Sequence, residues 1–432
     1  MGRVADRGLE RRDICFLTIL VFLWLALLGV QLEISSLPFR LALSDFVIGT
    51  YVIFLLWRKK IFFLMRYRGF LVLGVLFTFS LLWSYKNFGY LGQYALYNKY
   101  IGLVVLVVSA LFVSDWVSQK GKEGFQLCIL WFSCTTGLIN CFYLLAYLPP
   151  LTFLRDVFVF LPSTEARLRG LLVDPNAYGG LLMVALLLLL PALEDTTLGK
   201  WKRIVWISFF SLTVGLFLTT SRSAYLGFIS GILFFALLHR GALRRFLFFA
   251  LPAGGFILGV LLSPLREPVL ARIVSLKQIV SRMDIMEAGI RAFVSSPLFG
   301  LGLGSFFELS QTRFGLPWKQ IIHNSYLWIL ADMGIVGLGI WTYLLFRLWQ
   351  KGWRIFVLAR QNNTPESLYV LAVLASLAGM LTFALGVEAL YQRYLWMLIG
   401  LIIGLGKVKD LDVERDPFRD DEPSHSLSRH RG

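Results

Sequence analysis

Polar side chains with a capacity for chemistry stand at the borders of long apolar runs in this sequence. Arg222 lies in LTTSRSAYLG, between two such runs. An arginine near hydrocarbon costs about 2.5–3.5 kcal/mol at a helix centre, and less near the interface. Arg222 is therefore either a snorkelling residue that ends a helix or a ligand for a phosphate group. Its planar guanidinium suits the second role, because it can hold two phosphate oxygens at once.

A second polar segment is ARLRGLLVDPNAYGG, residues 166–180. Arg167 and Arg169 precede an apolar run, and Asp174 and Asn176 fall in the first outer turns of that run. The two short polar side chains could simply cap a helix that has Pro175 in its first turn. Alternatively, they form a polar wall that fixes Arg167 or Arg169 or hydrogen-bonds a sugar.

A histidine stands at the mouth of another apolar run, in IIHNSYLWIL at 321–330. His323 is one of four histidines, and the others lie in a short basic loop or in the C-terminal tail. Beside Asn324 and Ser325, His323 either caps a helix start or acts as a general base. Imidazole suits the second role because its unperturbed pKa, near 6.5, lets it take a proton from a hydroxyl near neutral pH.

The segment before this histidine combines helical spacing with charge. In SRMDIMEAGIRAFVSSP, 281–297, an imperfect apolar face consists of Ile285, Ala288, Ile290 and Phe293, and Arg282 lies on a polar one. This pattern predicts an amphipathic helix at the membrane surface. FGLGLGSF follows at 299–306. No strand precedes these glycines, so they predict a tight re-entrant turn rather than a dinucleotide-binding loop.

The elements that must position these residues are membrane-spanning helices. Hydrophobic residues make up 57% of the 432 residues, charged residues 16%, and the mean hydropathy is +0.70. A soluble domain has about 45–50% apolar and about 25% charged residues. The fold class expected is therefore an all-α polytopic membrane protein with about twelve spans. The runs lie near 14–30, 41–57, 70–85, 101–117, 125–148, 171–193, 204–220, 223–238, 246–263, 324–346, 368–387 and 394–406.

Lysine and arginine in the short loops predict the orientation. They gather in alternate loops, around residues 3–12, 58–60, 120–122, 200–203, 240–245 and 347–354. Positive loops stay in the cytoplasm, so both termini are expected there, with the first run as a signal anchor. Residues 1–406 then form one transmembrane domain with external loops at about 150–169 and 264–323, and the polar tail 407–432 is expected to be disordered.

Several function classes are disfavoured by composition and spacing. The net charge of +16 is spread over many short loops rather than gathered in a nucleic-acid-binding patch. The four cysteines all fall inside predicted spans and are interpreted as buried thiols. Neither HExxH nor a histidine–cysteine cluster occurs, so no metal site is expected. The arginines of the external loops instead indicate an anionic ligand.

At these residues the chain resembles the O-antigen ligase and O-antigen polymerase family of bacterial envelopes. The resemblance covers about 165–345 and rests on four motifs in a fixed order. These motifs are RLRGLLVDPNAYGG, TTSRSAYLG, RMDIMEAGIRAFVSSPLFGLGLGSF and HNSYLWILADMGIVGLG. The N-terminal third matches only in hydropathy.

The resemblance implies a membrane-embedded, all-helical glycosyltransferase of the bacterial inner membrane, with an external active site. It implies an undecaprenyl-diphosphate-linked glycan donor, a glycan or lipid-A-core-like acceptor, and no metal, nucleotide sugar or other cofactor. Carried over residue by residue, Arg222 and Arg282 bind the diphosphate and His323 acts near the acceptor. Arg167 and Arg169 compete for one further diphosphate position.

The remaining candidates are assigned to shaping the substrate site: Asp174, Asn176 and Asn324. His323 would deprotonate the attacking sugar hydroxyl, and in-line attack would invert the anomeric carbon. Because a diphosphate is already a good leaving group, positioning and charge neutralisation supply the rest of the catalysis.

Two other function classes stay open. A transporter or flippase of lipid-linked glycans would need cationic groups along the membrane midplane, whereas the arginines here lie at external ends. A non-catalytic assembly or sensor protein is the third class. Within the transferase class, ligase and polymerase differ in acceptor rather than in donor chemistry, and the sequence does not choose between them.

Overall fold

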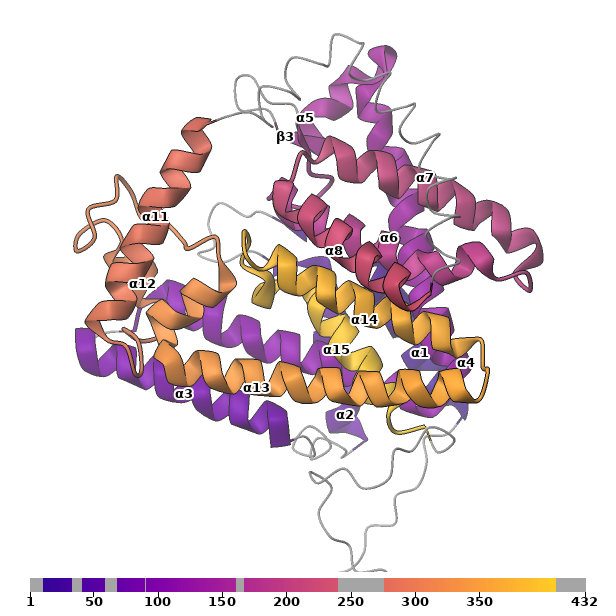
Figure 1. Ribbon diagram of the computed structural model, residues 1–432, viewed down its shortest axis with the longest axis horizontal. Helices are drawn as coiled ribbons and strands as arrows, with labels where there is room; N and C mark the ends of the chain where they lie inside the picture. Colours follow the sequence, from indigo (N-terminus) through magenta and orange to yellow (C-terminus); the bar gives the residue numbers. More distant parts are fainter. Residues whose placement is uncertain are drawn as a thin grey trace, which may run out of the picture.

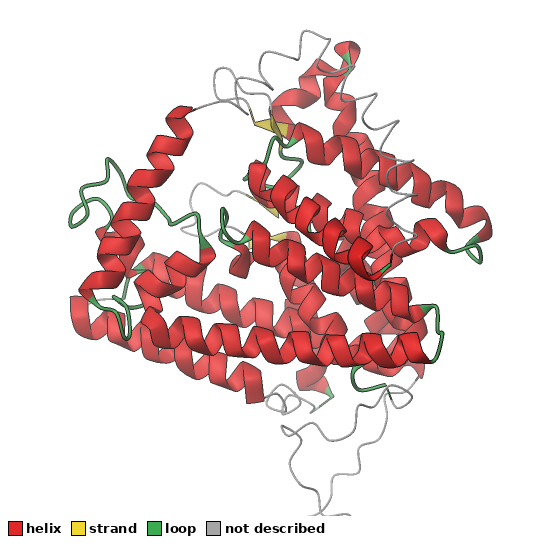
Figure 2. Cartoon of the chain, viewed as in Figure 1, coloured by secondary structure: helices red, strands yellow, loops and turns green. Residues whose placement is uncertain are grey.

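The computed structural model describes residues 11–32, 41–58, 68–89, 91–160, 167–239 and 276–408. Within these ranges the chain is almost wholly helical, and its four strands have two residues each (Figure 2). The predicted span at 246–263 lies outside the described residues, as do the start of the loop predicted to be external and the tail from 409 onward.

The first half of the described chain contains α1 (Arg11–Leu27), β1 (Gln31–Leu32), β2 (Leu41–Ala42), α2 (Leu43–Trp57), α3 (Arg68–Phe88), the π-helix η2 (Tyr94–Ile101), α4 (Gly102–Leu144), η3 (Leu145–Tyr147), η4 (Pro149–Leu154), α5 (Arg155–Phe158), β3 (Val159–Phe160) and β4 (Arg167–Leu168). The second half contains α6 (Pro175–Glu194), η5 (Gly199–Trp201), α7 (Lys202–Leu218), α8 (Arg222–Leu238), α11 (Leu276–Ser295), α12 (Ser305–Leu309), α13 (Ser325–Gln361), α14 (Glu366–Phe383), η6 (Ala389–Tyr391) and α15 (Arg393–Leu405). The strands form two antiparallel pairs, β1 with β2 and β3 with β4.

The helices support the predicted membrane fold class. Among the described residues, six helical segments are long and apolar enough to cross a bilayer. They are 68–88, 94–147, 175–194, 199–218, 325–361 and 366–383, and three shorter apolar helices are α2, α8 and α15. The segment 94–147 covers two predicted spans, because α4 breaks at Gly121, where φ is +67°. The total of about twelve spans remains a prediction.

Burial separates central helices from peripheral ones. The apolar side chains of α6 from Leu181 to Leu190 are at most 5% exposed, and α14 and α15 are similarly covered. Helices that are apolar all round belong in the interior of a bundle. Outer helices instead expose large apolar side chains, such as Val75 at 70% and Leu237 at 78%. A surface of this kind is suited to lipid rather than to water.

The motifs singled out in the sequence gather at one end of the helix bundle. Hydrogen bonds and charge interactions connect the start of α6, the start of α8, α11, the start of α13 and the α14–α15 connection, and we call this the site end (Figure 1). At the opposite end, which we call the basic end, the C-terminal ends of α6 and α8 lie near the N-terminal ends of α7 and α14. There His239 pairs with Glu194, and Tyr369 donates to Asp195.

The two ends allow a direct test of the predicted orientation. Gln311 lies at the site end and Thr197 at the basic end, and both are exposed. We expect a cysteine placed at Gln311 to react with an impermeant thiol reagent added outside intact cells, while one placed at Thr197 stays unlabelled. The unaltered chain measures background from its four own cysteines. Labelling at Thr197 alone would reverse the topology and put the site in the cytoplasm.

A break in α13 connects this helix to the glycine-rich segment 299–306. At Gly334 φ is +65°, and the backbone N–H groups of Ile335 and Val336 donate to the carbonyls of Pro297 and Leu298, at 2.9 and 3.2 Å. A Cβ at Gly334 would collide with the Leu298 carbonyl. The segment 299–306 does turn tightly, with Gly300, Gly302 and Gly304 at positive φ, and it packs on the broken helix.

Replacing Gly334 by alanine should therefore destabilise the protein. A side chain at positive φ costs about 1–3 kcal/mol, and the colliding group is backbone that cannot rotate away. We expect a lower thermal midpoint for the detergent-solubilised protein. The matched control is Gly339→Ala in the same helix, where a Cβ meets nothing within 4 Å. Equal midpoints for the two variants would show that the break does not depend on glycine.

Candidate active site

Arg222 is placed by the turn between α7 and α8. The two helices are separate, as predicted: α7 ends at Leu218 and α8 begins at Arg222. Thr220 has φ +49°, and Ser221 caps α8 by accepting from the Ala224 backbone N–H at 3.4 Å. Arg222 therefore stands in the first turn of α8, half-buried at the site end.

Arg167 forms hydrogen bonds to this turn. Its side chain is 4% exposed, and its Nε donates to the Thr219 carbonyl and to Thr220 Oγ1, both at 3.0 Å. One terminal nitrogen donates to Asn176 Oδ1 at 2.9 Å. The guanidinium is thus committed to protein groups, and it ties β4 to α6 and to the turn that carries Arg222.

Arg169, the other arginine of this motif, has a different environment. It is half-buried, and its contact with the Asp156 carbonyl is long, at 3.4 Å. Its Nε is buried and finds no hydrogen-bond partner among the described residues. The structure therefore does not bring Arg169 into the arginine–histidine group described below.

Asp174 and Asn176 combine the two roles considered for them. Asp174 is the N-cap of α6, because its Oδ1 accepts from the Asn176 backbone N–H at 2.9 Å. The same oxygen accepts from Asn176 Nδ2 at 3.0 Å, which turns the amide oxygen toward Arg167. The pair both caps the helix and fixes Arg167.

Arg282 comes from α11 and faces Arg222. Burial lowers the pKa of Arg282 most, the neighbouring Arg222 lowers it further, and Asp174 raises it. Gly386, in the α14–α15 connection, lies against both helices: a Cβ there would collide with Ser223 and stand 3.8 Å from an Arg282 terminal nitrogen. Two guanidinium groups thus share a partly buried space, a pairing that a bound anion stabilises.

The helix that carries Arg282 is the amphipathic helix expected from the sequence. α11 starts five residues earlier than predicted, at Leu276 rather than 281. Ile285, Ala288 and Ala292 are buried, and α11 packs on α13. Ile290, predicted on the inner face, is instead 51% exposed. Its position follows the outer stripe of the helix, so the buried face is narrower than the sequence indicated.

His323 is fixed just before α13. Asn324 is the N-cap of that helix, and its Oδ1 accepts from the Leu327 backbone N–H at 3.0 Å. Burial lowers the pKa of His323 most, Arg282 lowers it too, and Asp174 and Glu388 oppose them. The net direction is downward from 6.5, so the imidazole is neutral near pH 7 and able to accept a proton.

Two features that sequence reasoning did not assign also shape this end. Asp332, fully buried in α13, accepts from the backbone N–H groups of Gly304 and Phe306 at 2.9 and 3.0 Å. A single acid within an apolar run was the available signal, since a charge in a span needs a partner. The second feature is the ion pair of Lys99 with Glu388.

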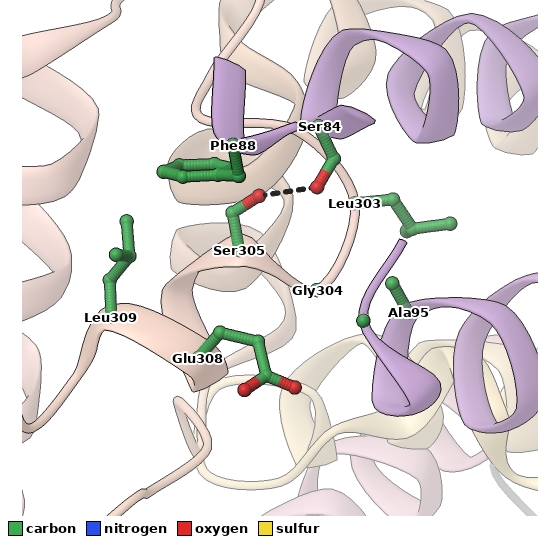
Figure 3. Close-up of a pocket in the computed structure, with 9 residues that line it drawn as sticks. Ser84, Phe88, Ala95, Leu303, Gly304, Ser305, Glu308 and Leu309 are labelled. Carbon is green, nitrogen blue, oxygen red and sulfur yellow. Dashed lines mark hydrogen bonds between the residues drawn. The ribbon is translucent and has the colours of Figure 1, made fainter. Parts of the chain in front are cut away.

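A small cavity lies beside α12 but apart from the arginine–histidine group. It is lined by residues of α3, η2 and the 303–309 segment, and within it Ser84 and Ser305 share a hydrogen bond of 2.9 Å (Figure 3). None of the predicted site residues lines it. Within the described residues, no three His, Cys, Asp or Glu side chains stand close enough together to hold a metal ion.

Comparison with known proteins covers the central part of the chain. The family model described as O-antigen ligase matches residues 206–342. The match includes Arg222, Arg282, His323 and Asn324, and begins after the motif at 166–180. No curated protein matches the chain. Residues 206–342 are therefore similar to the O-antigen ligase family, in line with the resemblance that the motifs carry.

Proposed function

We propose that this protein transfers a glycan from an undecaprenyl-diphosphate donor to a sugar hydroxyl of an acceptor, on the external face of the bacterial inner membrane. The observation that carries the proposal is the meeting of Arg222, Arg282 and a neutral His323 at one end of a membrane bundle. The family match over the same residues supports a glycan-transferring enzyme.

In the proposed reaction the two arginines bind the diphosphate. Their paired donors neutralise charge on the leaving group as it departs. The donor's hydrocarbon chain stays in lipid, and its sugars extend beyond the site end. Arg167, buried behind the turn, has a positioning role in this scheme, because it fixes the residues that precede Arg222.

His323 acts on the acceptor. Its ring takes the proton of the attacking hydroxyl, the hydroxyl oxygen forms a bond to the anomeric carbon of the donor, and the bond from that carbon to the diphosphate oxygen breaks. The products are the extended acceptor and undecaprenyl diphosphate, with the anomeric configuration inverted. The imidazolium then returns its proton to solvent. The protein's own part is thus binding, orientation and one proton transfer.

Reconstitution tests the proposal. The purified protein in liposomes receives an undecaprenyl-diphosphate glycan and, in separate arms, a lipid-A-core-like acceptor or a second lipid-linked glycan. We expect a glycan-extended acceptor and free undecaprenyl diphosphate in one arm, and that arm identifies a ligase or a polymerase. Movement of labelled donor across the bilayer without any covalent product would instead indicate a flippase.

A further inference from the structure

Lys99 lies in an environment that is unusual for a lysine. Its side chain is 2% exposed and forms an ion pair with Glu388. The ammonium also faces three aromatic rings, at 4.3 Å from the centroid of Tyr391, 4.4 Å from Trp328 and 5.1 Å from Tyr94. Cation–π attraction and the carboxylate together compensate the ammonium for lost water. The pair is thereby fixed rather than mobile.

The ion pair of Lys99 and Glu388 is not expected to add much to the stability of the fold. Removing two charges from water costs free energy that their mutual attraction only about offsets, and apolar replacements are often neutral or stabilising. Glu388 itself remains partly open, with 13% of its side chain exposed. A charge in a partly buried site is less screened than one in water, so it can act on a neighbouring group that titrates.

Hydrogen bonds hold the segment of His323 against the segment of Glu388. Ser325 Oγ donates to the Val387 carbonyl at 2.9 Å and accepts from the Ala389 backbone N–H at 2.7 Å. These two partners flank Glu388 on both sides. The start of α13 and the α14–α15 connection are therefore registered to one another, which holds the backbone on both sides of Glu388 against the helix start that follows His323.

Three charged side chains act on His323 from the elements around it. Arg282 comes from α11, Asp174 from the start of α6, and Glu388 from the α14–α15 connection. Arg282 opposes a positive charge on the ring, and the two carboxylates favour it. Asp174 acts on His323 more strongly than Glu388 does but also faces Arg282, whereas Glu388 is paired with Lys99 in the aromatic cage.

We propose that Glu388, anchored by Lys99, is a positioning residue that stabilises the positive charge His323 gains when it takes the acceptor proton. The inference rests on the proposed function of His323 as general base. The carboxylate touches neither donor nor acceptor in this scheme. It makes the ring a stronger base than burial beside Arg282 would otherwise allow, and the ion pair with Lys99 holds that carboxylate in place.

The test compares Glu388→Gln with the parent across pH. The amide keeps the shape and loses the charge, so the acid limb of the pH–rate profile should move to lower pH. The plateau rate should fall roughly 10-fold, a part of the 10²–10⁴-fold that general base catalysis contributes. The Glu388→Asp variant keeps the charge, so the acid limb of its pH–rate profile should lie close to that of the parent. A purely structural role would lower the yield of folded protein without moving the limb.

The matched control is Glu308→Gln. Glu308 is also a partly buried acid paired with a lysine, Lys319, at 2.5 Å, and it lies on α12 rather than beside His323. Its variant should keep the parental acid limb.

A second measurement separates this inference from the proposed function. Diethyl pyrocarbonate modifies a histidine ring only in its neutral form. The pH dependence of modification at His323, followed by mass spectrometry, therefore reports the protonation of that ring without any turnover. We expect the modification curve of Glu388→Gln to shift to lower pH. If the parent and the Gln and Asp variants modify alike at every pH, the inference fails even where transfer is observed. If the curve shifts but no transfer occurs in the parent, the electrostatic pairing stands and the proposed function fails.

Discussion

Replacing His323 by alanine should lower turnover by about 10²–10⁴-fold, the usual contribution of a general base, while donor binding stays near the parental value. In the proposed reaction the arginines hold the donor, and the histidine acts only on the acceptor hydroxyl. Turnover is to be measured per folded protein in liposomes, with donor binding assayed in parallel.

The parent protein should also show a characteristic pH dependence. Because burial and Arg282 lower the pKa of His323 below 6.5, the catalytically competent neutral ring persists below that pH. The rate should therefore be flat near pH 7 and fall only as pH drops through the lowered pKa. An acid limb of the pH–rate profile centred above pH 6.5 would contradict the environment assigned to His323.

His239 provides the control for this substitution. It lies at the C-terminal end of α8, paired with Glu194 at 3.1 Å, at the basic end of the bundle. His239→Ala should keep turnover within a few-fold of the parent. Turnover of His323→Ala in that same range would remove the general-base assignment, although transfer itself would still stand.

Lysine in place of Arg222 or of Arg282 should cost most of the activity. Lysine keeps the positive charge but loses the planar fork that binds two phosphate oxygens. Each lost charge-assisted hydrogen bond contributes about 1.5–3 kcal/mol, equivalent to roughly 10–150-fold. In the proposed reaction the diphosphate is bound in the ground state and leaves in the transition state, so both donor affinity and turnover should fall.

A control for the arginine variants lies on the same helix as Arg282. Arg291 is about half exposed, 3.9 Å from Glu287, and one of its nitrogens donates to the Phe314 carbonyl at 3.1 Å. Arg291→Lys should bind donor as the parent does. Parental affinity and turnover in both the Arg222 and Arg282 lysine variants would make these arginines structural, and the anion site would have to be sought elsewhere.

The sequence placed Arg222, Arg282 and His323 on one predicted side of the membrane, and the family resemblance assigned all three to one site. In the structure Arg282 interacts electrostatically with both Arg222 and His323. The helix of Arg282 and the turn at 299–306 were also predicted, from helical spacing and from glycine content.

Other features could not be predicted because they depend on packing between distant segments. Lys99 and Glu388 are 289 residues apart, and no local pattern joins them. The burial of Arg167 depends on the α7–α8 turn folding over it. α13 continues to Gln361, beyond the predicted end at 346, because Arg347, Lys351, Arg354 and Arg360 lower the hydropathy of its later turns without interrupting the helix.

The break at Gly334 has a consequence for biogenesis. A regular helix would bond the N–H groups of Ile335 and Val336 to the carbonyls of Ala331 and Asp332. Here the loop supplies Pro297 and Leu298 as acceptors for those two donors, and the N–H groups of Leu301 and Gly302 reach the two released carbonyls, each at 2.9 Å. The broken helix and the loop therefore leave none of these four helix groups without a hydrogen bond.

The backbone N–H and C=O groups of these residues can therefore be hydrogen-bonded in two ways, within a continuous helix or between the broken helix and the loop. Unpaired backbone groups cost several kcal/mol each in hydrocarbon, so α13 could not enter the bilayer already broken and alone. It can enter as one continuous helix, with Gly334 in the ordinary helical conformation, and break when the loop 297–302 docks. On this course the site end would be completed after insertion rather than during it.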